Sequence, residues 1–210
     1  MSAALITGSA PQLHLLSGGH RSASAEQLVL IGQPQPIRVP EHRLRSWLED
    51  PTVLARFDAK CYRRSENLCS VWLGGVSSTG YGSFRAASLP GPTRPGTVSA
   101  HLFAYQLAHG VIPRLGWSGT QDTVICHQCD FTGCVNPAHM RLGTHATNRF
   151  EYLTRRRNLA SPLADVRGAA GRARALACAI RTGLAHDEDA TTIEKRIRDA
   201  ETAGQPLTLW

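Results

Sequence analysis

Apolar residues recur at roughly helical spacing in two stretches of the first half of the chain. The first is EHRLRSWLEDPTVLARF, residues 41–57, with apolar side chains at Leu44, Trp47, Leu48 and Leu54. Because proline has no backbone N–H and clashes with the preceding turn, Pro51 is expected to break or restart this helix. The second is VSAHLFAYQLAHG, residues 98–110, where Gly110 is a typical helix stop signal. Both stretches are predicted to be helical.

Shorter apolar runs bounded by glycine and serine indicate strands. CSVWLGGVSSTGYGSFRAAS, residues 69–88, has two apolar and aromatic stretches on either side of a Gly/Ser-rich turn, which predicts a β-hairpin. SLPGPTRPGT, residues 88–97, is predicted to be a loop, and DTVICHQC, residues 122–129, begins as a β-branched strand. Together with the helices, these strands predict a small α+β domain with antiparallel hairpins.

The pattern becomes helical again after residue 143. THATNRFEYLTRRRN, residues 144–158, predicts a helix with Thr144 as its N-cap and arginines in its last turn. Further along, GRARALACAIRTGL and TTIEKRIRDAETAG are both amphipathic and predict two short helices. The chain is therefore expected to consist of an irregular N-terminal arm, residues 1–40, a central domain, residues 41–158, and a helical C-terminal extension, residues 159–210.

Composition and charge narrow the range of functions. The chain has 210 residues, which suits one functional unit, and its 23 Lys and Arg against 16 Asp and Glu give a formal charge of +7. A basic excess of this size favours a polyanionic partner such as nucleic acid. No apolar run is long enough to span a membrane, and the N-terminus lacks the basic start and compact apolar stretch of a signal peptide. A cytoplasmic protein is therefore expected.

The cysteines are spaced as metal ligands rather than as a disulfide framework. Of the six, three fall within nine residues, at Cys126, Cys129 and Cys134. Cys129, Cys134 and His139 follow one another at intervals of five, and tetrahedral zinc needs a fourth ligand. Cys69 is the favoured donor because the predicted hairpin would bring it alongside. Cys126 forms a C-x-x-C with Cys129 and stays open as an alternative fourth ligand. As a strand residue next to His127, however, it should point to the opposite face of the strand.

Two residues beside this cluster suit the hydrolysis of phosphodiesters. The reaction needs an activated water and a cation that neutralises the phosphate and the leaving oxygen. His127, at the end of the predicted strand, has an imidazole of the kind that activates water as a general base. Asn148, in the first turns of the following helix, offers an amide oxygen to a hard divalent cation. Both would act on one phosphate if strand, zinc loop and helix fold back on one another.

The stretch CHQCDFTGCVNPAHMRLGTHATNRF, residues 126–150, resembles the His-Cys box and HNH endonucleases of the ββα-metal superfamily. That family has a catalytic His, a Cys two residues later, a second Cys five further on, an NPxH turn ending in a zinc-binding His, and a metal-binding Asn nine residues beyond. In this chain those positions are His127, Cys129, Cys134, Asn136 to His139, and Asn148, without a gap. Upstream, C-x-x-W, G-Y-G and A-H-x-x-A-Y-x-x-x-H-G also match, at residues 69–72, 80–82 and 100–110.

The resemblance implies a ββα-metal nuclease core with a structural zinc bound by Cys69, Cys129, Cys134 and His139. It implies that His127 activates the water, that Asn148 holds a single catalytic Mg²⁺ or Mn²⁺, and that Arg94 supports the scissile phosphate. The chain departs from the homing enzymes of the family because Cys178 is the one cysteine after His139, so a second Cys/His cluster is lacking.

The expected activity is hydrolysis of double-stranded DNA that leaves 5′-phosphate and 3′-hydroxyl ends, and a homodimer would allow both strands to be cut. DNA contacts are expected from the basic end of the helix after the zinc loop, at Arg149, Arg155, Arg156 and Arg157. Asp130 is expected to stabilise the loop by a hydrogen bond rather than to bind the metal, and His101 and His109 are expected to pack in their helix. Two alternatives stay open: a restriction or modification-dependent endonuclease with the same core, and a zinc-stabilised DNA-binding module that does not cut.

Overall fold

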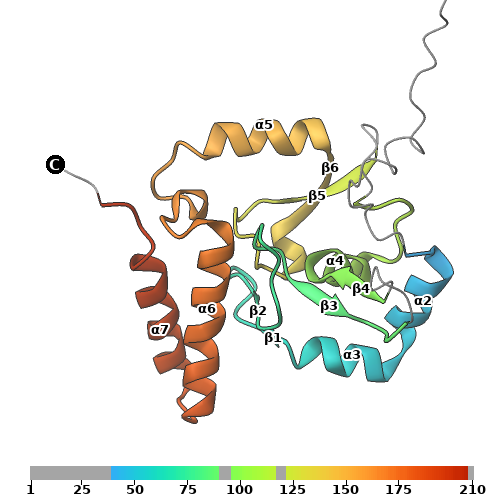
Figure 1. Ribbon diagram of the computed structural model, residues 1–210, viewed down its shortest axis with the longest axis horizontal. Helices are drawn as coiled ribbons and strands as arrows, with labels where there is room; N and C mark the ends of the chain where they lie inside the picture. The colour runs from blue at the N-terminus through green and yellow to red at the C-terminus, as the bar shows by residue number, and fades with distance from the viewer. Residues whose placement is uncertain (1–38, 90–95, 117–121, 208–210) are drawn as a thin grey trace, which may run out of the picture. The chain divides into compact units, whose positions relative to one another are not determined.

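The computed structural model describes residues 39–89, 96–116 and 122–207. These residues combine helices with short antiparallel two-stranded sheets, in agreement with the predicted α+β class (Figure 1). None of the described helices is long and apolar enough to cross a membrane. Arg94 and most of the predicted N-terminal arm lie outside the described residues.

The first two helices of the described residues meet at Pro51, as predicted. Helix α2, Glu41–Glu49, ends directly before Asp50, and α3, Pro51–Asp58, begins with the proline. The Asp50 side chain caps α3 by accepting hydrogen bonds from the backbone N–H groups of Thr52 and Val53, at 2.8 and 3.4 Å. The proline restarts the helix because an N–H in the first turn has no partner inside the helix.

The strand pairing between residues 61 and 99 differs from the predicted hairpin. Strand β1, Cys61–Tyr62, pairs with β2, Val71–Trp72, and β3, Ser83–Arg85, pairs with β4, Thr97–Ser99. Within residues 69–88, the one bridge between the two predicted halves joins Val76 to Gly82. Around this bridge the Ser83 N–H donates to the Gly75 carbonyl at 2.8 Å and the Ser77 N–H donates to the Tyr81 carbonyl at 2.9 Å. The predicted hairpin is therefore present next to its turn, whereas β2 and β3 pair with other strands.

The Trp72 indole explains this outcome. Its Nε1 donates a hydrogen bond to the Gly75 carbonyl at 3.1 Å. A Cβ at Gly74 would lie 2.7 Å from the indole, and one at Gly82 would lie 2.6 Å from it, so both glycines leave room for the ring. The segment therefore folds around a buried tryptophan instead of forming a regular ladder.

Helix α4, Ala100–His109, contributes to the main apolar core together with α2, α3 and β3. It ends at Gly110, whose φ of 85° is left-handed, as the stop signal predicts. The rings of Trp72, Phe84 and Phe103 lie 5.3, 5.0 and 4.8 Å from the ring of Phe57, measured between centroids. This aromatic cluster packs α3 and α4 against β2 and β3.

A hairpin and a helix carry most of the predicted site residues. Strand β5, Thr123–His127, pairs with β6, Met140–Thr144, so that His127 lies opposite Met140, and a short 3₁₀ turn, Pro137–His139, precedes β6. Strand β6 was not among the predicted elements. Helix α5, His145–Arg155, follows directly, and the Thr144 side chain accepts the Thr147 N–H at 3.2 Å, which confirms the predicted N-cap.

The predicted C-terminal helices are present and pack beside each other (Figure 1). They are α6, Gly168–Ala185, and α7, Ala190–Thr202, and a 3₁₀ turn, Pro162–Ala164, lies before them. Leu176 and Ile180 of α6 share an apolar cluster with Val71 of β2 and with Phe131 and Cys134 of the loop between β5 and β6. The C-terminal helices thus share a core with the segment that holds the cysteine cluster.

Candidate metal centre and active site

Four side chains from two distant segments converge at the loop between β5 and β6. The ligand atoms of this group all lie within 4.8 Å of one another, and its members are Cys69, Cys129, Cys134 and His139. The Nδ1 atom of His139 is 3.5 Å from the Cys69 sulfur and 3.8 Å from the Cys134 sulfur. Three thiols and one imidazole are a donor set of structural zinc sites, so these residues fit a zinc ion.

The side chain of Asn136 holds the two halves of the metal cluster together. Its Nδ2 donates to the Glu66 and Leu68 carbonyls at 3.0 and 3.1 Å, just before Cys69 in the chain. Its backbone N–H points at the Cys134 sulfur, at 3.4 Å. Sequence reasoning recognised Asn136 as part of the NP turn, but its link to residues 66–68 depends on contacts about 70 positions apart.

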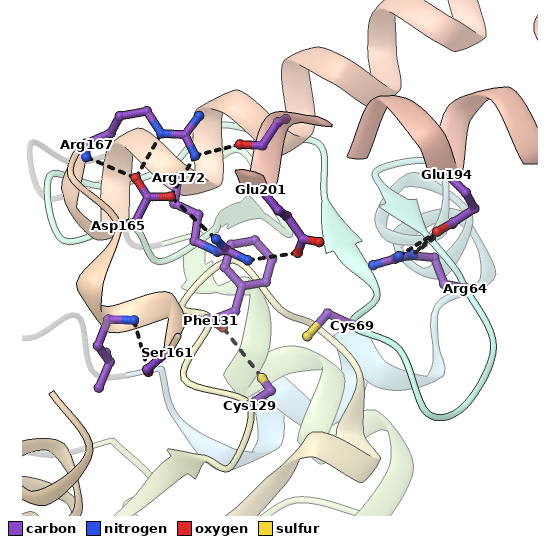
Figure 2. Close-up of polar contacts among 12 residues, drawn as sticks. Arg64, Cys69, Cys129, Phe131, Ser161, Asp165, Arg167, Arg172, Glu194 and Glu201 are labelled. Atoms are coloured by element: carbon purple, nitrogen blue, oxygen red, sulfur yellow. Dashed lines mark hydrogen bonds and ion pairs between the residues drawn. The ribbon is translucent and has the colours of Figure 1, made fainter. Parts of the chain in front are cut away.

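The thiols of the cluster interact with one another and with a buried arginine. Hydrogen bonds from the Cys134 and Cys69 thiols hold the pKa of the Cys129 thiol far below its ordinary value, which favours a thiolate, the form that binds metal. Arg64 forms an ion pair with Glu194 of α7 at 2.5 Å (Figure 2). The hydrogen bond between Cys69 and Cys129 raises the pKa of the Cys69 thiol, and the nearby Arg64 guanidinium opposes this shift. In Figure 2 the Cys69 and Cys129 sulfurs are turned toward the space between the two residues.

Cys126 lies outside the cluster. Its side chain is fully buried and faces Thr147 of α5, since a Cβ at Gly143 would lie 2.6 Å from the Cys126 sulfur and 2.9 Å from the Thr147 hydroxyl. The fourth member of the cluster is therefore Cys69, as the sequence favoured, and Cys126 turns to the opposite face of β5.

His127 is the last residue of β5 and is 8% exposed. Its Nε2 is 3.2 Å from the Cys134 carbonyl oxygen. Because a carbonyl oxygen only accepts, Nε2 carries the proton and Nδ1 keeps a free lone pair. Ring centroids of His101 and Tyr81 lie 5.2 and 6.0 Å from that of His127. Burial lowers the pKa of His127, which favours the neutral imidazole.

Asn148 lies on the side of α5 that faces the hairpin. It is half-buried, and Glu151 and Arg155, three and seven positions later, both contact the hairpin or the turn that follows β5. Successive strand residues point to opposite faces, so Cys126 faces α5 while the His127 ring lies against rings of the α4 side. In the described part of the chain, no hydrogen bond joins the His127 imidazole to Asn148.

The arginines of α5 divide into two kinds. Arg149, Arg156 and Arg157 are exposed, and the Arg156 guanidinium lies 5.7 Å from the centre of the Tyr152 ring. Arg155 is half-buried and donates to the His127 and Gln128 carbonyls at 3.3 and 3.1 Å. Sequence reasoning grouped all four as DNA contacts, because the pattern of charge does not reveal which arginine has partners inside the protein.

The remaining residues singled out in the sequence have definite environments. Asp130 accepts a hydrogen bond from the Ser161 hydroxyl at 3.0 Å, which agrees with the predicted loop-stabilising role. His101 is buried, and burial holds its pKa well below the ordinary value. His109 is exposed and lies over the Tyr105 ring at 4.3 Å, so the expectation of a packed histidine holds for His101 more than for His109.

Comparisons of the chain with protein-family models, curated proteins and solved structures find no match. The function is therefore inferred from the chemistry and geometry of these residues.

Proposed function

We propose that this chain is a metal-dependent DNA endonuclease of the ββα-metal type. The observation that carries the proposal is the position of His127: it ends a strand beside the Cys/His cluster, and its Nε2 donates to the Cys134 carbonyl. This leaves Nδ1 as the atom that can accept a proton. The loop of residues 128–139, here called the metal loop, carries three of the four cluster residues. The order of β5, metal loop, β6 and α5, with Asn148 in α5, supports the same proposal.

His127 would act as the general base. Its ring is held by the Cys134 carbonyl on one side and lies among the rings of Tyr81 and His101. A base fixed in one tautomer and one orientation needs no rearrangement before it takes a proton from the attacking water. General-base catalysis of this kind contributes about 10²- to 10⁴-fold to the rate.

The Cys/His cluster would hold a structural zinc rather than take part in the reaction. All four of its positions are occupied by protein ligands, which is typical of structural rather than catalytic zinc sites. Since Cys134 supplies both a ligand and the carbonyl that holds His127, an intact cluster would position the base. The free energy of metal binding would then become free energy of folding for the loop.

Asn148 would supply an amide oxygen to the catalytic cation. When bound, Mg²⁺ or Mn²⁺ would neutralise charge on the phosphate and on the leaving oxygen. An amide oxygen is a hard ligand that suits such an ion, and a single protein ligand leaves room for phosphate oxygens and waters. The exposed arginines of α5 and the formal charge of +7 favour DNA as the substrate, with double-stranded DNA preferred.

Nicking of supercoiled plasmid with and without Mg²⁺ tests this function. We expect Mg²⁺-dependent cutting by the wild type and a loss of at least about 10²-fold in His127→Ala, with zinc content and DNA affinity retained. His42→Ala, which removes an exposed histidine of α2, is the matched control and should cut normally. Cutting by His127→Ala at the wild-type rate would contradict the proposed base.

One observation favours a second candidate, a zinc-stabilised DNA-binding module that does not cut. The His127 side chain is largely buried against α4, and a buried imidazole that only packs needs no substrate. The same plasmid assay separates the two functions, because a binding module would retard DNA without nicking it at any Mg²⁺ or Mn²⁺ concentration.

A further inference from the structure

Arg155, in the last turn of α5, contacts the end of β5, the residues that follow it and Glu151 of its own helix. Its Nη1 is 3.1 Å from the Gln128 carbonyl oxygen and 3.1 Å from the Asp130 carboxylate. Its Nη2 is 3.3 Å from the His127 carbonyl oxygen and 3.2 Å from the Glu151 carboxylate. Each terminal nitrogen thus makes one contact with a charged group and one with the backbone.

The partners of Arg155 extend these contacts to β6 and to the segment after α5. Glu151 also forms an ion pair with Arg141 of β6. Asp130, whose φ of 57° is left-handed, accepts a hydrogen bond from Ser161, which lies beyond α5. Asp tolerates this backbone conformation better than most residues. Arg155 therefore connects α5 to both strands of the hairpin and to the metal loop.

These contacts fix the position of Asn148. Seven residues separate Asn148 from Arg155, which corresponds to about two helical turns, so both lie on the side of α5 that faces the hairpin. Rotation of α5 about its axis, or sliding along the hairpin, would break the bonds from Arg155 to the His127 and Gln128 carbonyls. Arg155 thus ties the helix that carries the amide to the residue that carries the imidazole.

The neighbouring arginines are more exposed than Arg155. Arg156 and Arg157 are exposed, whereas 31% of the Arg155 side chain is exposed. A guanidinium has a planar fork of N–H donors, and those of Arg155 point at acceptors inside the protein. A phosphate would have to displace the Asp130 and Glu151 carboxylates to reach them.

We propose that Arg155 is a positioning residue of the nuclease site rather than a DNA contact. The inference rests on the proposed endonuclease function. By locking α5 to the end of β5, Arg155 would hold the helix that carries Asn148 in a fixed position relative to the backbone of His127. Because misplacement of a reacting group by about 1 Å can cost about 10² in rate, loss of Arg155 should lower turnover and leave DNA affinity nearly unchanged.

The test compares three single substitutions in the full chain. Arg155→Ala is expected to lower kcat about 10²-fold, with Kd for plasmid DNA within about twofold and an unchanged dependence of Kd on salt. Arg156→Ala should instead raise Kd and reduce the salt slope by about one counterion. Arg198→Ala removes an exposed arginine of α7 and should change none of these quantities.

A conservative variant separates positioning from general loss of structure. Arg155→Lys keeps the charge but replaces the planar fork by a single ammonium. Compared with Arg155→Ala, it should therefore recover more of the thermal stability than of kcat. Asp130→Asn keeps a residue that tolerates the left-handed backbone and removes one ionic partner of Arg155. It should lower kcat about tenfold, and it decides the outcome if Arg155→Ala does not fold.

The results that would overturn the inference are specific. If Arg155→Ala raises Kd and lowers the salt slope as Arg156→Ala does, with kcat unchanged, Arg155 is a phosphate contact. Unchanged kcat in Asp130→Asn, when Arg155→Ala is unfolded, would also overturn it. Failure of the wild type to nick DNA would remove the endonuclease function itself, and the salt slopes would still report whether Arg155 touches phosphate.

Discussion

The two sides of the metal loop are held by different forces. On the α6 side, Phe131 and Cys134 are buried with Leu176 and Ile180, and the Arg172 guanidinium lies 5.7 Å from the centre of the Phe131 ring (Figure 2). On the α5 side, the contacts are mainly polar: no residue of α5 is buried. Its Phe150 is 71% exposed, and ion pairs from Arg141 and Arg155 provide most of the attachment.

Apolar burial holds the α6 side in place, whereas ion pairs and hydrogen bonds hold the α5 side. Burial of apolar area is strong and insensitive to salt, whereas each partly exposed ion pair contributes about 1 kcal/mol or less and weakens as salt rises. Three of the four cluster residues therefore lie on the α6 side, which apolar burial holds in place. The position of helix α5, which carries Asn148 and the exposed arginines, depends instead on the salt-sensitive contacts of Arg141 and Arg155.

The largest expected effect comes from removing a candidate metal ligand on the α6 side. Cys134→Ala should abolish zinc binding and cost at least about 3 kcal/mol, because metal binding is part of folding in such sites. This corresponds to a fall in Tm of about 6 to 12 °C. Elemental analysis and thermal melting measure both quantities. Cys178→Ala, at an exposed cysteine of α6, is the control, and equal zinc content in the two variants would contradict the structural metal.

A smaller effect is expected from the apolar packing behind the loop. Leu176 is 1% exposed, so Leu176→Ala should destabilise the fold by about 2 to 5 kcal/mol and weaken zinc retention against a chelator. Leu184→Ala, at a residue of the same helix that is 46% exposed, should have little effect. Urea denaturation with parallel zinc release measures the difference. Zinc retention unaffected by loss of Leu176 would mean that α6 does not support the cluster.

The smallest effect is expected on the α5 side. Glu151→Gln removes a carboxylate that pairs with both Arg141 and Arg155, and should cost about 1 kcal/mol or less. In the wild type, raising NaCl from about 0.1 M to about 1 M should reduce hydrogen-exchange protection in α5 more than in α6. Equal salt sensitivity of the two helices would remove the distinction between them.

Much of the architecture follows from local chemistry. Pro51 separates two helices, Thr144 caps α5, and Gly110 ends α4, each as the pattern predicted. The hairpin within residues 69–88 forms next to its turn but does not extend to β2 and β3, because strands of two or three residues carry little pairing information. Their partners were decided by a tryptophan that packs on its own glycines.

The candidate metal ligands could be predicted from local sequence, whereas the roles of the arginines could not. Cys129, Cys134 and His139 could be chosen from spacing alone, and Cys69 needed only a plausible fold. Nothing in the charge pattern separated Arg155 from Arg156, because a solvated arginine and a half-buried one have the same local sequence signal.

The ends of the helices and the side chains that can bind zinc were predictable from the sequence, because capping and ligand chemistry depend on residue type and short spacing. The tertiary structure decided which strands pair, which face of β5 His127 presents and which arginine turns inward. Those outcomes depend on contacts between residues far apart in the sequence, where packing and shared acceptors outweigh local preference.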